Sequence, residues 1–205
     1  MCIICIGHTI LDKIKVIRFT KRCLILKIVA LVGSTRRNST TRKAAEIVIK
    51  EVEKHGIAVE IIHFAEVKLP IYEGDLDKED YPLVVKDFIK KIAAADGIIL
   101  ASPEYHGSVS GVLKNALDYI GAREMSGKLA AIIGTAGSQL GAANTVNTLH
   151  QICRNLHAWA LPQSPTIPVA YEAFNQDGSL KDEKLQERLE KLGLKFAEEL
   201  KMRVK

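Results

Sequence analysis

Three segments of this chain combine glycine, hydroxyl and planar side chains directly after apolar runs, a composition that suits ligand binding. The longest extends from Ser102 to Asp118 and follows the apolar run Gly97–Ala101. Two shorter segments, Gly33–Ser39 and Gly134–Ser138, also begin where apolar runs end. Ligands of open α/β sheets bind in the crevice outside the carboxyl ends of the strands. If the three apolar runs are neighbouring strands, the three segments form one site.

The segment Gly33–Ser39 has the chemistry of a phosphate-binding turn. Backbone N–H groups at the start of a helix, with the helix dipole behind them, attract an anion. Arg36 adds a charge-assisted, bidentate donor, and hydroxyl groups are supplied by Ser34, Ser39, Thr40 and Thr41. The segment lacks the lysine of a Walker P-loop and the three glycines of a dinucleotide fingerprint, which favours a single phosphate. A capped turn with surface arginines is the alternative interpretation.

The other two segments suit a flat ligand. The planar side chains of Tyr105 and His106 lie between Pro103 and Gly107, and the glycine permits a close approach of the backbone to a ring. His106 as a catalytic base is an alternative, although no nucleophile or metal ligand accompanies it. The small residues of 134–141 allow a ring to lie over them, and the next helix N-terminus favours a ring that becomes anionic on reduction. Together, the three segments predict a phosphorylated planar cofactor.

Alternation of apolar runs and amphipathic segments defines the elements that position these groups. Apolar runs predict strands at 24–32, 58–63, 97–101 and 129–133, and a fifth at 159–169 that prolines interrupt. Apolar residues at helical spacing predict helices at 40–55, 82–95, 112–120, 142–156 and 185–200. Such alternation requires a parallel sheet with right-handed crossovers. We expect an α/β, flavodoxin-like three-layer sandwich, with a five-stranded parallel sheet of order 2-1-3-4-5 and helices on both faces.

Composition and charge argue against a nucleic-acid-binding protein and against a membrane-spanning protein. The chain has 205 residues and a net charge of +5, but residues 1–26 hold five cations against one acid. The remainder is close to neutral, which argues against a nucleic-acid-binding surface. No apolar run approaches the roughly 20 residues of a membrane span. We therefore expect a single domain at 26–205, preceded by a poorly ordered N-terminal extension at 1–25.

The cysteines give no sign of a disulfide framework, since three of the four lie in the first 25 residues and only Cys153 lies beyond them. A reducing cytoplasm is therefore the expected location. Cys2 and Cys5 with His8 and Cys23 make a possible zinc set, but no second ligand pair at finger spacing follows. We expect no metal site.

The motifs resemble those of the NADPH-dependent FMN reductase family of flavodoxin-like proteins, which includes azobenzene, quinone and chromate reductases. The likeness covers residues 26–170 and depends on three blocks in the order of the family. The blocks are Gly33-Ser34-x-Arg36-x-x-Ser39, then Ser102-Pro103-Glu104-Tyr105-His106-Gly107-Ser108 with Ser110-Gly111-x-Leu113-Lys114-Asn115-Ala116-Leu117-Asp118, and the glycine-rich segment after the fourth strand.

The resemblance implies a role for each block. Bound FMN would pass electrons from NADPH or NADH to a small acceptor such as a quinone, an azo compound, free flavin or a metal oxyanion. The phosphate would be held by Ser34, Arg36 and Ser39, and the Thr40 hydroxyl at the start of the helix can add a hydrogen bond. The flavin ring would be lined by Pro103, Glu104, Tyr105, His106 and Gly107, and at its other edge by Ala136, Gly137 and Ser138. Many members have asparagine in place of His106, which leaves the backbone contacts intact and alters the substrate face. Family members form homodimers or homotetramers. Lys114 and Asn115 lie a turn or more into the helix that follows, so they are expected to be structural or to lie at a subunit interface rather than to be catalytic.

Two other functions remain open at this level. A flavodoxin-type electron carrier would bind the same cofactor, but such carriers are usually strongly acidic so that they steer onto basic partners. A cofactor-free regulatory domain of the same fold would have no need of Arg36 and Ser39 in a phosphate turn. The near-neutral charge of residues 27–205 therefore favours the enzyme.

Overall fold

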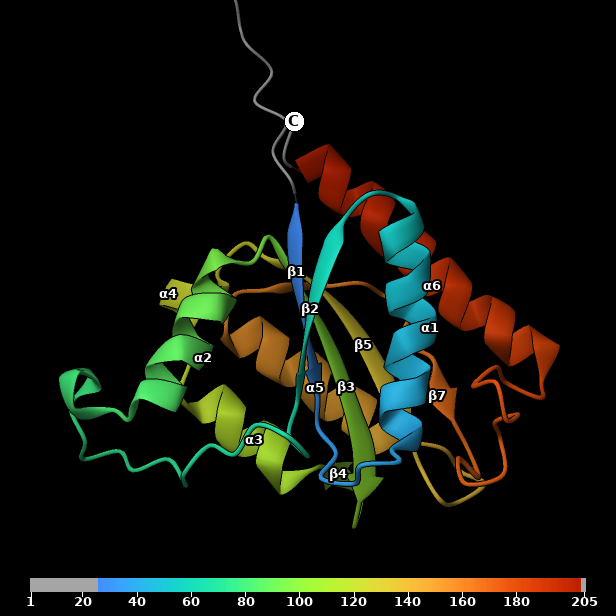
Figure 1. Ribbon diagram of the computed structural model, residues 1–205, viewed down its shortest axis with the longest axis horizontal. Coiled ribbons are helices and arrows are strands. Elements are labelled where there is room, and N and C mark those ends of the chain that lie inside the picture. Colours follow the sequence, from blue (N-terminus) through green and yellow to red (C-terminus); the bar gives the residue numbers. More distant parts are fainter. Residues whose placement is uncertain (1–25, 204–205) are drawn as a thin grey trace, which may run out of the picture.

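Parallel strands form a twisted sheet whose carboxyl ends meet at one edge (Figure 1). The computed structural model describes residues 26–203, so the expectations for 1–25, including the cysteine set, lie outside the described residues. The strands are β1 Lys27–Val32, β2 Ala58–His63, β3 Gly97–Tyr105, β4 Ser108–Val109, β5 Leu129–Thr135, β6 Trp159–Ala160 and β7 Thr166–Ile167. The helices are α1 Thr40–Lys54, α2 Leu83–Ala94, α3 Gly111–Asp118, α4 Ala122–Met125, α5 Ala143–Asn155 and α6 Glu183–Arg203, with a 3-10 turn at η1 Lys78–Asp80.

The sheet has the order β2-β1-β3-β5-β6, which is the predicted 2-1-3-4-5 arrangement of its parallel strands. β4 pairs with β3 and is antiparallel to it, while β7 lies beside β5 and is parallel to it. Residues 26–203 thus form a seven-stranded sheet where five strands were expected. The segment expected as a fifth strand divides into β6 and β7, and Pro162 and Pro165 lie between them, because proline cannot donate to a strand ladder.

Two apolar layers hold the helices against the sheet. Ile28, Ala30 and Val32 of β1 face the layer formed with α1 and α6, whereas Val29 and Leu31 face the layer formed with α2, α3 and α5. This alternation is the period-two side-chain pattern of a strand that is buried on both faces. Figure 1 shows α1 and α6 side by side on one face, with α2, α3 and α4 on the other. None of the helices within residues 26–203 is both long and apolar enough to cross a membrane.

The C-terminal helix follows its sequence pattern closely. The apolar stripe predicted for α6 is buried, and its members are Leu185, Leu189, Leu192, Phe196 and Leu200. The charged side chains occupy the opposite face, where Lys191 pairs with Glu187 and Lys195 pairs with Glu199. Such exposed pairs contribute little to stability, so burial of the stripe is what fixes this helix.

Candidate functional site

A hollow of about 260 Å³ opens at the carboxyl edge of the sheet, between the turn after β1, the end of β3 and the turn after β5. This volume is near the lower end of the range for small-molecule pockets. The residues that line it are Ser34, Arg36, Asn38, Ser39, Thr40, Thr41, Pro103, Glu104, Tyr105, His106, Thr135, Ala136, Gly137, Ala170 and Tyr171. The three segments singled out in the sequence therefore meet at one place, as expected.

The turn after β1 leads into α1, and its hydroxyl-bearing residues line the hollow. Ser39 is the N-cap of α1, and its hydroxyl accepts from the N–H of Arg42 at 3.2 Å. The hydroxyl of Ser34 is buried and accepts from the N–H of Arg36 at 3.3 Å. The first N–H groups of a helix have no partner within it, so those of Thr40 and Thr41 remain available in the hollow. This arrangement fits an oxyanion such as phosphate.

The guanidinium of Arg36 lies over the ring of Tyr171, 5.1 Å from its centre. Tyr171 lies after β7 and packs closely on the turn after β5, because a Cβ added at Gly137 would be only 3.1 Å from its ring. Tyr171 thus connects the turn after β1 (residues 33–39, the phosphate-type turn) with the turn after β5, which is expected to lie under a ring. The sequence motifs did not include Tyr171 or Ala170, although both directly follow the strand expected at 159–169, because residues 167–174 contain no glycine, serine or threonine.

The end of β3 differs from the loop expected at 102–107. β3 continues through Tyr105 and turns back into β4, so that Tyr105 pairs with Ser108. The two turn residues, His106 and Gly107, have φ angles of 52° and 78°. Two-residue hairpins of type I′ require positive φ at both positions, which is why Asn-Gly is their preferred sequence. The asparagine found at this position in the resembling family therefore has a backbone reason, and histidine is among the few residues that tolerate it.

This turn gives a prediction for His106. His106→Asn is expected to leave the free energy of unfolding within about 0.5 kcal/mol of the starting protein. His106→Val is expected to destabilise by about 1–2 kcal/mol, because a β-branched residue is strained at positive φ. Urea unfolding followed by circular dichroism measures both. Equal stability of the two variants would contradict the turn assignment, and a turnover loss of about 100-fold in His106→Asn would identify a general base instead.

Glu104 lines the hollow, and its carboxylate also makes a structural contact. Its carboxylate accepts from the backbone N–H of Thr145 at 2.9 Å, in the first turn of α5. Ala142, the N-cap of α5, makes no side-chain capping bond, so Glu104 supplies the cap from the neighbouring strand. Its carboxylate thus locks the hairpin to α5.

The third segment begins within β5, since Gly134 and Thr135 are still part of that strand. The buried hydroxyls of Thr135 and Thr41 lie 2.7 Å apart and share a hydrogen bond, which ties α1 to β5 beneath the hollow. Ala136 and Gly137 line the hollow, whereas the expected site residues Ser138 and Gly107 lie at its margin and are not among its lining residues. Thr135 and Thr41 therefore support the floor of the hollow.

The other polar residues of the long motif have structural partners. Lys114 forms an ion pair with Asp118 at 2.6 Å on the surface of α3. The side-chain oxygen of Asn115 accepts from the N–H of Tyr72, and its nitrogen donates to the carbonyl of Pro70. Asn115 thus fastens the loop between β2 and α2 onto α3, in keeping with the structural interpretation.

Gly33 is required by close packing beneath the phosphate-type turn. A Cβ at Gly33 would lie 2.8 Å from the hydroxyl of Ser110 and 2.9 Å from the Cβ of Leu113. Ser110 is the N-cap of α3, so any shift there disturbs a second helix start. We expect Gly33→Ala to lower the free energy of unfolding by about 1–3 kcal/mol, measured by urea denaturation.

The matched control for Gly33 is Gly111, the first residue of α3. A Cβ at Gly111 would meet nothing within 4 Å, and alanine favours helix by about 1 kcal/mol relative to glycine. Gly111→Ala should therefore be neutral or stabilising. Equal effects at the two glycines would contradict the close packing of the turn.

Nucleophilic and metal chemistry find little support within residues 26–203. Burial raises the pKa of the Cys153 thiol to about 12, so this cysteine stays protonated and is a poor nucleophile. No group of three or more histidine, cysteine, aspartate or glutamate side chains in the described part of the chain is arranged to hold a metal ion. The hollow instead presents hydroxyls, backbone donors, a guanidinium and planar rings, which suit a phosphorylated ring cofactor such as FMN.

Comparison with known proteins agrees with this chemistry. A family model described as NADPH-dependent FMN reductase matches residues 26–172. An NADPH azoreductase of Bacillus sp. (strain OY1-2) is 32% identical over 155 residues, which is 76% of this chain and 82% of that protein. A 2-hydroxy-1,4-benzoquinone reductase of Burkholderia sp. is 32% identical over 160 residues, 76% of this chain and 85% of that protein. The solved structure of FerB, a flavoenzyme NAD(P)H:(acceptor) oxidoreductase from Paracoccus denitrificans, has a TM-score of 0.72 at 27% identity and covers 87% of this chain and 98% of that chain. The motifs, the fold and these matches agree, and the chain belongs to the NADPH-dependent FMN reductase family.

Proposed function

We propose that this protein is an NAD(P)H-dependent flavin oxidoreductase that passes electrons through bound FMN to a small acceptor. The acceptors that fit are quinones, azo compounds, free flavin and metal oxyanions. One observation carries the proposal: a single hollow joins a helix N-terminus with buried hydroxyls to the Pro103–His106 hairpin and the Ala136–Gly137 turn. The relatives named above, an azoreductase and a benzoquinone reductase, support the same class of reaction.

The residues of the hollow divide into two groups. We assign the phosphate to Ser34, Arg36, Ser39 and Thr40, because these surround the N-terminus of α1. We assign the ring to the β3 hairpin and to the turn after β5, with Gly107 and Ser138 at the margin. Bound FMN supplies the electron transfer, accepting two electrons from NAD(P)H and giving them to the acceptor. The protein orients the reactants and needs no acid–base side chain.

The open form of the hollow supports a broad range of acceptors. Tyr105 is 40% exposed and Tyr171 is 62% exposed, and both rings border the hollow. Planar side chains that are partly free can stack against a second flat molecule. NAD(P)H and the acceptor can therefore use the same open side in turn.

The test begins with the purified protein, which is expected to be yellow or to become yellow when FMN is added. In the absence of oxygen, NADPH or NADH should remove the visible absorbance of the bound flavin by reducing it. A quinone or an azo dye should then restore that absorbance. Protein that binds no FMN would overturn the proposal. A screen of acceptors and of both nicotinamide cofactors under steady turnover then ranks the substrates.

A flavodoxin-type FMN electron carrier is the second candidate, and the same preparation separates it from the enzyme. A carrier would bind FMN yet be reduced only by a partner protein. The charge distribution opposes this candidate, because residues 27–205 are close to neutral and carriers of this kind rely on strong negative charge for steering.

We also propose a homodimer or homotetramer that works in the cytoplasm and binds no nucleic acid. Large apolar side chains stand exposed at several places, among them Ile71, Leu83 and Leu140, and the buried core of a subunit interface is rich in such side chains. The buried, protonated Cys153 and the need for NAD(P)H suit a reducing compartment. Light scattering coupled to gel filtration measures the oligomeric state, and a monomer at micromolar concentration would contradict it.

A further inference from the structure

A buried histidine beneath the phosphate-type turn lacks one of its hydrogen-bond partners. His63 is the last residue of β2 and is paired in register with Val32, at the end of β1. Its side chain is 1% exposed. Its Nε2 atom is one of two buried side-chain nitrogen or oxygen atoms without a partner within residues 26–203. A buried polar group without a partner costs about 1–3 kcal/mol, so this atom needs an explanation.

The protonation state of His63 follows from its neighbours. Arg42 Nη1 lies 3.3 Å from His63 Nδ1, and a guanidinium can only donate. The Nδ1 atom must therefore accept, which leaves the proton on Nε2 in the neutral ring. Burial, followed by the nearby Arg42 charge, lowers the pKa of His63, against the smaller opposing effect of Glu66. The unpartnered Nε2 is therefore a hydrogen-bond donor.

The Arg42 side chain is occupied by contacts within the protein, so it is not proposed to bind a ligand. Its guanidinium contacts the Glu46 carboxylate at 2.9 Å and the Glu66 carboxylate at 2.7 Å. Its backbone N–H already caps α1 by donating to Ser39. Two carboxylates thus neutralise Arg42 and hold it against His63. The buried donor here that remains without a partner in the described part of the chain is His63 Nε2–H.

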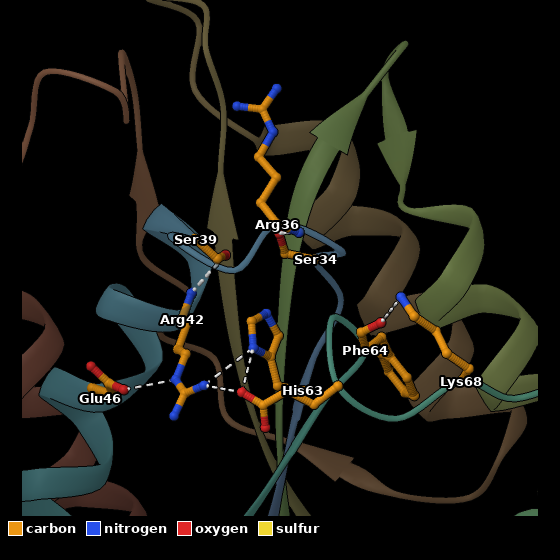
Figure 2. Close-up of polar contacts among 9 residues, drawn as sticks. Ser34, Arg36, Ser39, Arg42, Glu46, His63, Phe64 and Lys68 are labelled. Carbon is orange, nitrogen blue, oxygen red and sulfur yellow. Dashed lines mark hydrogen bonds and ion pairs between the residues drawn. The ribbon is translucent and has the colours of Figure 1, made fainter.

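Figure 2 shows where that donor points. The Nδ1 side of the His63 ring faces Arg42, and the opposite nitrogen is directed at the turn that carries Ser34, Arg36 and Ser39. Two independent features therefore converge on this turn: the N-terminus of α1 and a buried donor with no acceptor. The helix N-terminus favours an oxyanion, and the buried Nε2–H requires an acceptor.

We propose that His63 is a positioning residue for the phosphate group of the cofactor. His63 does not line the hollow, so it acts from beneath the Gly33–Ser39 turn. When phosphate binds at the N-terminus of α1, the Nε2–H, which has no partner within residues 26–203, gains an acceptor there. This inference rests on the proposed function, which puts the FMN phosphate at the N-terminus of α1. It adds a residue from β2, a strand that none of the sequence motifs included.

The test compares FMN with riboflavin, which is the same ring system without the phosphate. Apoprotein is titrated with each flavin, and quenching of flavin fluorescence gives the two dissociation constants. Their ratio isolates the contribution of the phosphate. For His63→Asn, which keeps an acceptor near Arg42 but has no donor at the Nε2 position, FMN affinity should fall about five- to tenfold, the usual net effect of one hydrogen bond. Riboflavin affinity should stay the same.

Two variants serve as controls. His63→Gln places an amide near the Nε2 position and should restore most of the FMN preference. His150 is also partly buried, with Nε2 2.9 Å from the Ser164 hydroxyl, but it lies on α5 outside the hollow. His150→Asn should leave both dissociation constants unchanged.

The outcomes distinguish a failure of the phosphate site from a failure of the role of His63. A starting protein that binds FMN and riboflavin equally would overturn both the phosphate site and the role of His63. A preference for FMN that survives intact in His63→Asn would overturn the role of His63 alone, as would equal loss of both flavins. Nitrogen-15 NMR of the histidine ring gives a readout that needs no variant: the neutral ring should carry its proton on Nε2, and that proton should exchange more slowly once FMN is bound.

Discussion

Arg36→Ala is expected to weaken FMN binding by about 1.5–3 kcal/mol, the scale of a charge-assisted hydrogen bond. This corresponds to roughly 10- to 150-fold in the dissociation constant. Riboflavin affinity should change little, because Arg36 lines the hollow beside the N-terminus of α1, where the phosphate is proposed to bind. Fluorescence titration of apoprotein with the two flavins measures the effect.

The adjacent residue provides a matched control for this prediction. Arg37 has the same charge and is exposed, but it does not line the hollow. Arg37→Ala removes the same charge from the same turn and should change FMN affinity by less than about 0.5 kcal/mol. If both arginine variants lose the same affinity, the effect is general electrostatic attraction, and Arg36 makes no specific contact.

Tyr171 should modulate the effect of Arg36. The ring lies 5.1 Å from the guanidinium carbon, and an exposed cation–π pair contributes about 0.5–1 kcal/mol. Tyr171→Phe keeps the ring and should keep FMN affinity, whereas Tyr171→Leu should lower it by that amount. In the background of Arg36→Ala, the Tyr171→Leu change should have no further effect, because residues in contact are not additive. If the two changes lowered FMN affinity by fully additive amounts, Arg36 and Tyr171 would act independently.

Phe196→Ala should cause the largest loss of stability, about 3–5 kcal/mol. The ring of Phe196 is fully buried, and a Cβ added at Gly97 would lie only 2.9 Å from its tip. Phe196 therefore packs directly on the first residue of β3, the strand whose other end forms the hairpin of the site. Because a domain of this size has a total stability of about 5–15 kcal/mol, the variant should unfold at much lower urea concentration.

Two further variants define the origin of that loss. Phe196→Leu retains most of the apolar volume and should cost less than half as much. Lys201→Ala lies on the exposed face of the same helix and should stay within about 0.5 kcal/mol of the starting protein. A Phe196→Ala variant as stable as Lys201→Ala would mean that α6 does not dock on the sheet as described.

Local patterns in the sequence were sufficient to predict most helices and strands of the fold. β2 occupies the predicted residues 58–63, and the apolar stripe of α6 is buried as its spacing required. These elements are specified by short-range periodicity, which the sequence displays directly. The ends of the strands were harder to predict from the sequence, because they depend on pairing with residues distant in the chain. β3 gains Ser102–Tyr105 by pairing with β4 and β5.

The candidate site shows the same division. Motif spacing predicted that Gly33–Ser39, the end of β3 and the turn after β5 would meet, and all three line one hollow. The glycines, hydroxyls and Arg36 were visible because each sits beside a strand end. The supporting contacts were not visible: the cap that the Glu104 carboxylate makes on α5 joins residues 41 positions apart.

The sequence by itself determined the alternation of strands and helices and the three segments that face a ligand. It did so because side-chain periodicity and turn-forming residues act over a few neighbouring positions. Only the tertiary structure brought Tyr171 over Gly137 and under Arg36, and directed the free nitrogen of His63 at the turn after β1. Those contacts join residues far apart in the chain, and their geometry depends on how the helices and strands pack, which no local pattern encodes.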